Sequence, residues 1–355
     1  MLYVTVIICS VYGFAIGATL LGLRRSGAAV ATLPNSRPDA VVIVAAHNEA
    51  SCIGACVRAL LEQDVADLPV VVVDDGSSDG SVAEAHRAAN GDPRLRVLSV
   101  SRRGKKRAVM AGIEATTAGR LLFTDADCVP PPGWAGAMLG ALEQADFVAG
   151  YAPLVPRTTL LGKVAALEAA ANAVTAEAMV GLGNPLMCSA RSMGYSRRAY
   201  EEAGGLEPHL HEPSGDDTLM MQAVHRSGGR VRYVPQPAVP GRGPSTLAEW
   251  TRQKRRHLST WRRFSIPATV AGLVVRSMDV LVVLGVPAAL LGLVGAAPLW
   301  AFGFKVVVDG AGLTWGLGRL GERSLLTALP LLELVHSPLV LVSAVRGAFG
   351  VPPWK

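Results

Sequence analysis

The sequence contains few charged residues and no paired cysteine motif. Asp, Glu, Lys and Arg make up 17% of the 355 residues, whereas 50% are hydrophobic, a composition that is apolar for a soluble protein. None of the five cysteines belongs to a CxxC pair, so a zinc site is not expected and we interpret them as reduced thiols. Aromatic residues account for 5% of the chain and do not interleave its basic runs. Although the net charge is +6, we therefore predict no nucleic-acid partner.

Two common nucleotide-binding motifs are missing as well. A dehydrogenase needs GxGxxG directly after its first strand, and a P-loop kinase needs GxxxxGK[ST]. The first strand-like run is followed instead by "AAHNEASC", without a glycine before Gly54, and no P-loop pattern occurs anywhere. Both classes of enzyme are therefore excluded.

Charge is absent from residues 2–23. This run is long enough to cross a bilayer, which takes about 20 apolar residues. Arg24 and Arg25 follow the run, whereas a secretory signal peptide carries its positive charge in front of the apolar part. The positive-inside rule then predicts a transmembrane anchor over residues 1–24, with the following domain in the cytoplasm.

Two more apolar regions lie toward the C-terminus. Residues 280–304 carry no charge, and residues 325–345 are mostly apolar. We predict transmembrane segments within residues 278–348 and leave their number open. Residues 246–265 are strongly basic with apolar positions at helical spacing, which predicts an amphipathic helix at the membrane surface.

Short apolar runs alternate with helical segments in the first half of the chain. The expected strands cover residues 41–46, 70–74, 95–100 and 120–124, and the expected helices between them cover 50–62, 80–89 and 105–116. This alternation indicates an α/β fold with a mostly parallel sheet covered on both faces. Beyond residue 150 it weakens, and helices are expected over 160–180 and 216–227.

Acidic residues follow three of the expected strands. They are Glu49, the pair Asp74 and Asp75 in "DDGSSDG", and Asp125 with Asp127 in "TDADC". Because ligands of parallel sheets bind beyond the carboxyl ends of the strands, we expect these groups to face one crevice. Each motif alone has a simpler interpretation, either a solvated acidic turn or a helix N-cap.

Asp125 and Asp127 would repel each other unless a cation lies between them. Mg²⁺ or Mn²⁺ prefers oxygen ligands, and Mg²⁺ usually takes one or two carboxylates and completes its shell with substrate phosphates and water. The sequence therefore predicts an acid-rich nucleotide site that works through Mg²⁺ or Mn²⁺.

Taken together and in order, six segments resemble the family 2 nucleotide-sugar glycosyltransferases. They are "VVIVAAHNEA", "VVVDDGSSDG", "RGKKRAVMAGIEATTAGRLLFTDADC", "MGYSRRAYEEAGGL", "SGDD" and "QKRRH". The resemblance covers about residues 39–263. It implies a GT-A domain, Rossmann-like with a mostly parallel sheet, over residues 39–245. Residues 39–150 would form its nucleotide-sugar-binding half and residues 151–245 its acceptor and catalytic half.

The resemblance also implies roles for individual residues. The nucleotide sugar would be bound by Glu49, Asp74, Asp75, Lys105, Lys106, Asp125, Gln253 and Arg256. Asp125 and Asp127 would hold the metal and diphosphate. The acidic dyad would be Asp216 and Asp217, of which Asp217 is the catalytic base.

The element "QKRRH" departs from the family's QxxRW pattern. His257 replaces the tryptophan, which puts acceptor stacking at that position in doubt, and Trp261 one turn later is a candidate substitute. Lys254 or Arg255 would join Arg256 near the phosphates.

We therefore predict a membrane-anchored, cytoplasm-facing, inverting glycosyltransferase. Its donor would be a nucleoside-diphosphate sugar, with uridine as the family expectation, and its acceptor a hydroxyl of a lipid-linked or lipid-like molecule or a saccharide. One alternative is a processive polysaccharide synthase, which generally needs more membrane helices than the three or four expected here. A sugar nucleotidyltransferase would need a glycine-rich triphosphate loop near the first strand, and none is present. The remaining alternative is a catalytically inactive membrane scaffold.

Overall fold

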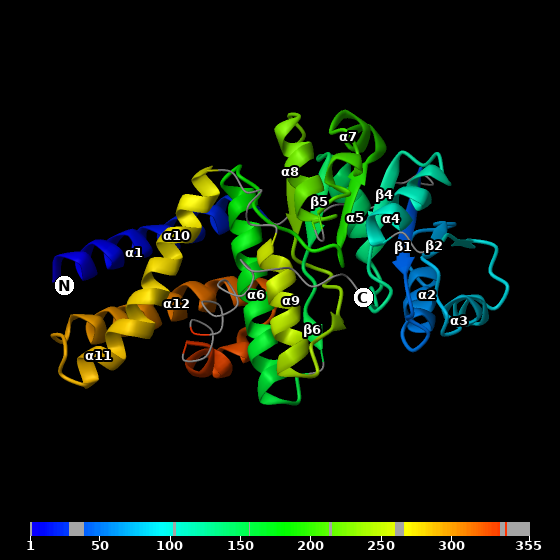
Figure 1. Ribbon diagram of the computed structural model, residues 1–355. Coiled ribbons are helices and arrows are strands. Elements are labelled where there is room, and N and C mark those ends of the chain that lie inside the picture. The colour runs from blue at the N-terminus through cyan, green and yellow to red at the C-terminus, as the bar shows by residue number, and fades with distance from the viewer. Residues whose placement is uncertain are drawn as a thin grey trace. The chain divides into compact units, whose positions relative to one another are not determined.

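The chain divides into two units. The computed structural model describes residues 2–27, 39–101, 104–155, 157–212, 215–259, 266–333 and 338 (Figure 1). One unit, here called the α/β unit, comprises Ser26–Val155 and Gly183–Arg242. The other, the helical unit, comprises Met1–Arg25, Pro156–Leu182 and Gly243–Lys355. This division differs from the predicted one, because the helix after residue 156 groups with the helical unit and not with the GT-A domain.

A mostly parallel sheet forms the centre of the α/β unit. In the described residues its strand order is β3-β2-β1-β4-β7-β5-β8. The neighbouring pairs β1–β2, β1–β4, β2–β3 and β5–β8 are parallel, and β7 runs antiparallel to both β4 and β5. The strands are β1 (Ala40–Ala46), β2 (Val70–Asp74), β3 (Leu95–Ser99), β4 (Arg120–Phe123), β5 (Phe147–Gly150), β7 (Met193–Ser196) and β8 (Val231–Val234). The predicted mostly parallel α/β sheet is confirmed. A small second sheet pairs β6 (Leu154–Val155) with β9 (Gly241–Arg242).

Helices cover both faces of this sheet. The helices of the unit are α2 (Ile53–Leu61), α3 (Ser81–Ala89), α4 (Lys105–Glu114), α5 (Trp134–Leu142), α7 (Arg197–Glu202), the short 3-10 helix η1 (Glu207–His209) and α8 (Thr218–Arg226). Val42 and Val44 of β1 belong to the same buried cluster as residues of α2 and α5. Ile43 faces the other way, toward α4. There a Cβ on Gly112 would lie 2.6 Å from Ile43 Cγ2, so glycine lets α4 approach the sheet closely.

The register aligns the carboxyl ends of the central strands. Strands β2 and β4 both pair in parallel with β1, with Ala46 beside Asp74 and Ile43 beside Phe123. The chain therefore leaves β1, β2 and β4 at the same edge of the sheet, and the predicted acidic residues follow at that edge.

The helical unit contains the two ends of the chain and one internal helix. Its described elements are α1 (Leu2–Arg25), α6 (Leu160–Gly181), α9 (Leu247–Ser259), α10 (Ile266–Val280), the π-helical η3 (Leu281–Gly285), α11 (Val286–Leu290), α12 (Ala297–Leu320) and the 3-10 helix η4 (Arg323–Ala328). Helix α1 packs against α6, α10 and α12 (Figure 1). At its crossing with α6 a Cβ on Gly22 would lie 2.2 Å from the carbonyl oxygen of Ala178, so only glycine fits.

Buried ion pairs join α6 to other helices of this unit. Glu177 accepts hydrogen bonds from Arg319 of α12 at 2.5 and 3.0 Å. Glu168 accepts one from Trp250 Nε1 at 3.1 Å and is paired with Lys254 of α9. Because breaking a buried pair leaves an uncompensated charge, these contacts fix α6 among the helices of the unit.

Among the described helices, α1 is the one long and apolar enough to cross a membrane, a criterion that a signal sequence also meets. The described residues do not show the predicted C-terminal membrane spans. The uncharged run 280–304 is divided between the end of α10, η3, α11 and the start of α12, with a break after Leu290. Much of the second run, 325–345, lies outside the described residues.

Candidate active site

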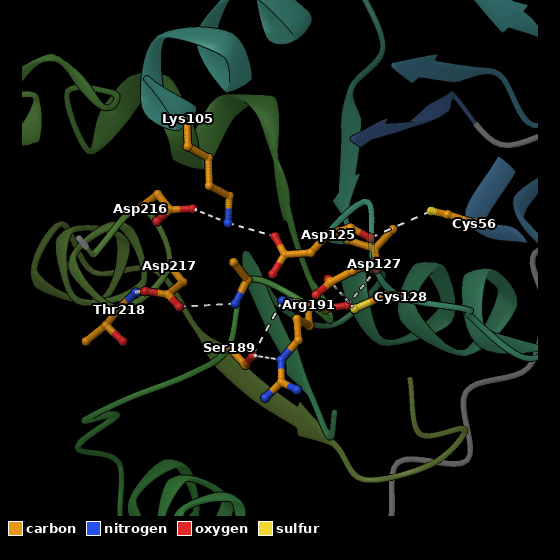
Figure 2. Close-up of polar contacts among 12 residues, drawn as sticks. Cys56, Lys105, Asp125, Asp127, Cys128, Ser189, Arg191, Asp216, Asp217 and Thr218 are labelled. Carbon is orange, nitrogen blue, oxygen red and sulfur yellow. Dashed lines mark hydrogen bonds and ion pairs between the residues drawn. The ribbon is translucent and has the colours of Figure 1, made fainter. Parts of the chain in front are cut away.

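A lysine links two acidic residues that are far apart in the chain. Lys105 begins α4, and its Nζ lies 2.7 Å from Asp125 Oδ1 and 3.0 Å from Asp216 Oδ2 (Figure 2). Burial alone would lower the pKa of Lys105, but the two carboxylates raise it above its ordinary value. Burial alone would raise the pKa of Asp216, but the Lys105 ammonium group holds it below its ordinary value. Lys105 and Asp216 are therefore both charged at neutral pH.

Asp217, next in the chain, has a different environment. It is the N-cap of α8, and its Oδ1 accepts a hydrogen bond from Thr218 N at 2.6 Å. Its Oδ2 accepts one from Ala190 N at 3.1 Å (Figure 2). Burial and the neighbouring charge of Asp216 raise the pKa of Asp217 to about 6. A carboxylate with such a pKa can take up and release a proton near neutral pH, as a general base must.

Asp125 and Asp127 follow β4 in a loop that is partly lined by cysteines. Cys56 Sγ lies 3.7 Å from the Asp125 carbonyl oxygen, and Cys128 Sγ lies 3.7 Å from Asp127 Oδ1 (Figure 2). The described residues contain no group of three or more His, Cys, Asp or Glu side chains that could hold a metal by themselves. Two hard carboxylates nevertheless fit Mg²⁺ or Mn²⁺ if substrate phosphates complete the coordination shell. The donor set thus suits a cation that is bound together with a substrate.

The loop after β2 is held in place by its own polar side chains. Asp75 is 1% exposed, and its Oδ2 accepts a hydrogen bond from Gly104 N at 2.9 Å, at the start of α4. Asp74 accepts a weaker one from Ser77 N at 3.2 Å. The Glu49 backbone N–H donates to Ser81 Oγ at 2.8 Å, which ties the loop after β1 to the loop after β2.

Comparison with known proteins identifies a family for part of the chain. Residues 41–204 match the model of "Glycosyl transferase family 2". The chain carries a family 2 glycosyltransferase domain. The predicted family and the GT-A fold are therefore confirmed.

Several relatives align with parts of the family 2 domain. Over 110 residues the chain is 33% identical to the uncharacterized glycosyltransferase YibD of Escherichia coli, covering 31% of this chain and 32% of YibD. It is 36% identical over 110 residues to the succinoglycan biosynthesis protein ExoO of Rhizobium meliloti, covering 31% of this chain and 30% of ExoO. The chain thus spans about a third of the length of these curated relatives. A longer alignment, 25% identical over 260 residues, reaches an N-acetylglucosaminyltransferase of Mesorhizobium japonicum and covers 66% of this chain and 57% of that protein.

A solved structure shares the fold over most of the chain. The mannosyltransferase PcManGT from Pyrobaculum calidifontis, in complex with GDP-Man and Mn²⁺, superposes with a TM-score of 0.55. The match covers 94% of this chain and 99% of PcManGT. Because the sequence identity is 20%, the match shows a shared fold only.

Lys106, which is predicted to bind the nucleotide sugar, has backbone partners in the described residues. Lys106 Nζ donates hydrogen bonds to the carbonyl oxygens of His209 and Glu212 at 2.7 and 2.6 Å, and burial lowers its pKa. Its ammonium group thus braces the loop that leads to Asp216. A contact of Lys106 with the nucleotide stays a prediction.

The basic element on α9 belongs to the helical unit. Gln253 lies in α9, as does the backbone of Arg256, whose side chain is outside the part of the chain that the structure describes. The side chain of His257 and all of Trp261 are outside it as well. Lys254 is paired with Glu168. A role of Gln253 and Arg256 in binding the donor stays a prediction.

Sequence reasoning missed the segment Ser189–Arg191, which joins the two carboxylate loops. Ala190 N donates to Asp217, and the Arg191 carbonyl oxygen accepts a hydrogen bond from Thr124 Oγ1 at 2.8 Å, one residue before Asp125. The segment precedes β7 and carries no motif. Its role depends on contacts with residues far away in the sequence, which a local sequence pattern cannot predict.

Proposed function

We propose that the protein is a membrane-associated glycosyltransferase that transfers a sugar, with inversion, from a nucleoside-diphosphate sugar to a hydroxyl group of a lipid-linked or lipid-like acceptor. The observation that carries the proposal is the pair of differently held carboxylates at one site. Asp217 has a pKa raised to about 6, and the adjacent Asp216 is joined through Lys105 to Asp125 beside the predicted metal ligand. The family 2 domain and the GDP-Man and Mn²⁺ in the PcManGT complex support the same interpretation.

The chemistry follows from these positions. In a direct displacement the acceptor oxygen attacks the anomeric carbon, the bond from that carbon to the diphosphate oxygen breaks, and the diphosphate leaves with the electron pair. The Asp217 carboxylate takes the proton of the acceptor hydroxyl, and its two backbone hydrogen bonds keep it oriented for this step. Asp125 and Asp127 would hold Mg²⁺ or Mn²⁺, which when bound neutralises charge on the diphosphate.

The acceptor class rests on the helical unit. Helix α1 exposes large apolar side chains, among them Leu2, Tyr3 and Phe14, which are 65%, 85% and 78% exposed. Because large exposed apolar patches are rare on soluble monomers, a bilayer suits this surface. Arg24 and Arg25 at the end of α1 then favour a cytoplasmic position for the catalytic domain. An acceptor that itself resides in the membrane would be within reach of such an enzyme.

A donor screen tests the proposal. The full chain in detergent is incubated with a panel of UDP- and GDP-sugars, with Mn²⁺ or Mg²⁺ and a polyprenol or glycolipid acceptor, and the released nucleoside diphosphate is measured. We expect release with at least one donor, dependent on the cation and on the acceptor. Sizing the product separates a single transfer from the polymer that a processive synthase would make. No turnover and no binding of any donor would contradict the proposal and favour the inactive scaffold.

A further inference from the structure

Arg191 has a buried donor group for which the described residues provide no hydrogen-bond partner. It lies between the segment that holds Asp217 and the first residue of β7. Its Nε lies 3.2 Å from Ser189 Oγ. Its Nη1 is buried and makes no hydrogen bond with any described residue. A buried N–H donor without an acceptor is costly, and a phosphate oxygen would supply the missing acceptor.

The arginine is confined beside the loop that carries the predicted metal ligands. A Cβ built on Gly241 of β9 would lie 3.1 Å from Arg191 Nη1 and 3.0 Å from Cys128 Sγ. The Arg191 nitrogen and the Cys128 sulfur therefore both lie next to Gly241. Cys128 directly follows Asp127 in the chain and lies against its carboxylate. In the view of Figure 2 the backbone of Arg191 lies beside Asp127 and Cys128, and the guanidinium group extends past Ser189 on the side away from the Asp127 carboxylate. The glycine leaves room for the guanidinium group and limits where it can turn.

The other described cations near these carboxylates are already engaged. Lys105 lies between Asp125 and Asp216, and Lys106 donates to two carbonyl oxygens. Within the described residues Arg191 forms no ion pair with a carboxylate and retains an unused N–H donor. A phosphate that enters this acid-rich site needs positive charge besides the predicted metal ion, and Arg191 is placed to supply it.

We propose that Arg191 is a phosphate-binding residue of the active site. The planar guanidinium group would take phosphate oxygens by two parallel hydrogen bonds, a geometry that lysine cannot reproduce. The phosphate is either the diphosphate of the donor or a phosphate on a lipid acceptor. The inference rests on the proposed function in placing that phosphate at a glycosyl-transfer site.

The test compares R191M and R191K with the wild-type chain in detergent. R198M is the matched control, because the Arg198 side chain is 74% exposed and lies on α7. Binding of inorganic pyrophosphate, UDP and GDP is measured by calorimetry with Mn²⁺ present, and thermal unfolding checks that each variant is folded. We expect R191M to bind pyrophosphate about tenfold to a hundredfold more weakly, as for the loss of a charged hydrogen bond. R191K should recover part of this loss, and R198M should bind as the wild type does.

The two phosphate sources give different results. If Arg191 contacts the donor, R191M weakens nucleoside diphosphate and pyrophosphate alike. If it contacts the acceptor, nucleoside diphosphate binding is kept, and binding to vesicles containing polyprenyl phosphate falls relative to vesicles of neutral lipid. Either result supports the inference.

The inference and the proposed function can fail separately. Wild-type affinity of R191M for pyrophosphate, nucleoside diphosphates and polyprenyl phosphate would overturn the role of Arg191 while leaving the proposed function in place. A wild-type protein that binds no nucleoside diphosphate or sugar donor, but still binds pyrophosphate through Arg191, would overturn the proposed function alone. If R191M does not fold, R191K decides: unchanged affinity for pyrophosphate, nucleoside diphosphates and polyprenyl phosphate would contradict a role for the guanidinium group.

Discussion

Replacing Asp217 by asparagine separates catalysis from binding. The substitution keeps the N-cap of α8, since asparagine caps helices as well as aspartate does, and its side-chain oxygen can still accept the 2.6 Å bond from Thr218 N. The 3.1 Å bond from Ala190 N is lost, because the amide nitrogen cannot accept it. Without a proton acceptor we expect turnover to fall about 10²- to 10⁴-fold, the usual contribution of a general base. This corresponds to about 3–5 kcal/mol in the activation barrier.

The same substitution should not cost stability above pH 6. The pKa of Asp217 is raised from 3.8 to about 6 by burial and by Asp216, so the folded state holds this proton more tightly than the unfolded chain does. Ionisation of Asp217 therefore disfavours folding, by an amount that grows from about pH 4 to about pH 6 and then stays constant. A shift of this size corresponds to at most about 3 kcal/mol. D217N cannot ionise and escapes this cost, while losing about 1 kcal/mol with the Ala190 bond.

Three measurements test this reasoning on Asp217. Release of nucleoside diphosphate gives turnover, calorimetry gives donor affinity, and thermal unfolding from pH 4 to pH 8 gives stability. We expect D217N to bind the donor as the wild type does and to unfold at an equal or higher temperature at pH 7.5, with this advantage disappearing toward pH 4. Wild-type turnover should decline as the pH falls below about 6, because the base becomes protonated. A D217N variant with a tenth or more of the wild-type turnover, or one that loses donor affinity as strongly as turnover, would refute the assignment of the base.

Three further substitutions probe the rest of the protein. Asp127→Ala removes a predicted metal ligand, so calorimetry should show donor affinity reduced about tenfold or more with Mn²⁺ and unchanged with a chelator; equal loss in both conditions would contradict the role. Lys105→Met leaves two partly buried carboxylates without their shared cation, and denaturant unfolding at pH 7 should show a loss of about 3 kcal/mol. Gly112→Ala places a Cβ 2.6 Å from Ile43 Cγ2 and should destabilise the α/β unit by about 1–3 kcal/mol. Gly17→Ala in α1, where no atom lies within 4 Å of the new Cβ, is the control and should be neutral or stabilising.

The strands that could be predicted are those whose residues specify them locally. The runs "VVIV" in β1 and "VVVV" in β2 are rich in β-branched residues and buried on both faces, as strands inside a parallel sheet must be. Strand β7 (Met193–Ser196) has the sequence "MGYS", which carries no such signal. It is a strand because it pairs antiparallel with both β4 and β5, and strand propensity is easily overridden by such context.

The position of α6 shows another limit of sequence reasoning. Its alanine-rich sequence predicts a helix, and the structure confirms one. The unit to which it belongs depends on Glu168 and Glu177, whose partners Lys254 and Arg319 lie far downstream in the chain. No spacing or periodicity within α6 contains that information.

The roles of the two neighbouring lysines could not be told apart from the sequence either. Lys105 and Lys106 are the first residues of α4, and consecutive residues of a helix point about 100° apart. Lys105 therefore reaches Asp125 and Asp216, whereas Lys106 reaches the carbonyl oxygens of His209 and Glu212. The strand-end acids could be predicted because topology places them at one edge of the sheet, but side-chain direction depends on the folded loops around them.

The surroundings of Asp216 and Asp217 give these two neighbouring carboxyl groups different pKa values. Asp216 lies beside the Lys105 ammonium group, which keeps its pKa low, whereas burial and the charge of Asp216 raise the pKa of Asp217. When the pKa values of two adjacent carboxyl groups differ, the group with the low pKa can act as a fixed negative charge. The group with the raised pKa can take up and release a proton. Lys105 also contacts Asp125, a residue that is proposed to bind the donor. The negative charge of Asp216 therefore lies near the proposed donor position. Asp217, the proposed proton acceptor, is held instead by the backbone N–H groups of Thr218 and Ala190, which stay neutral when a substrate binds.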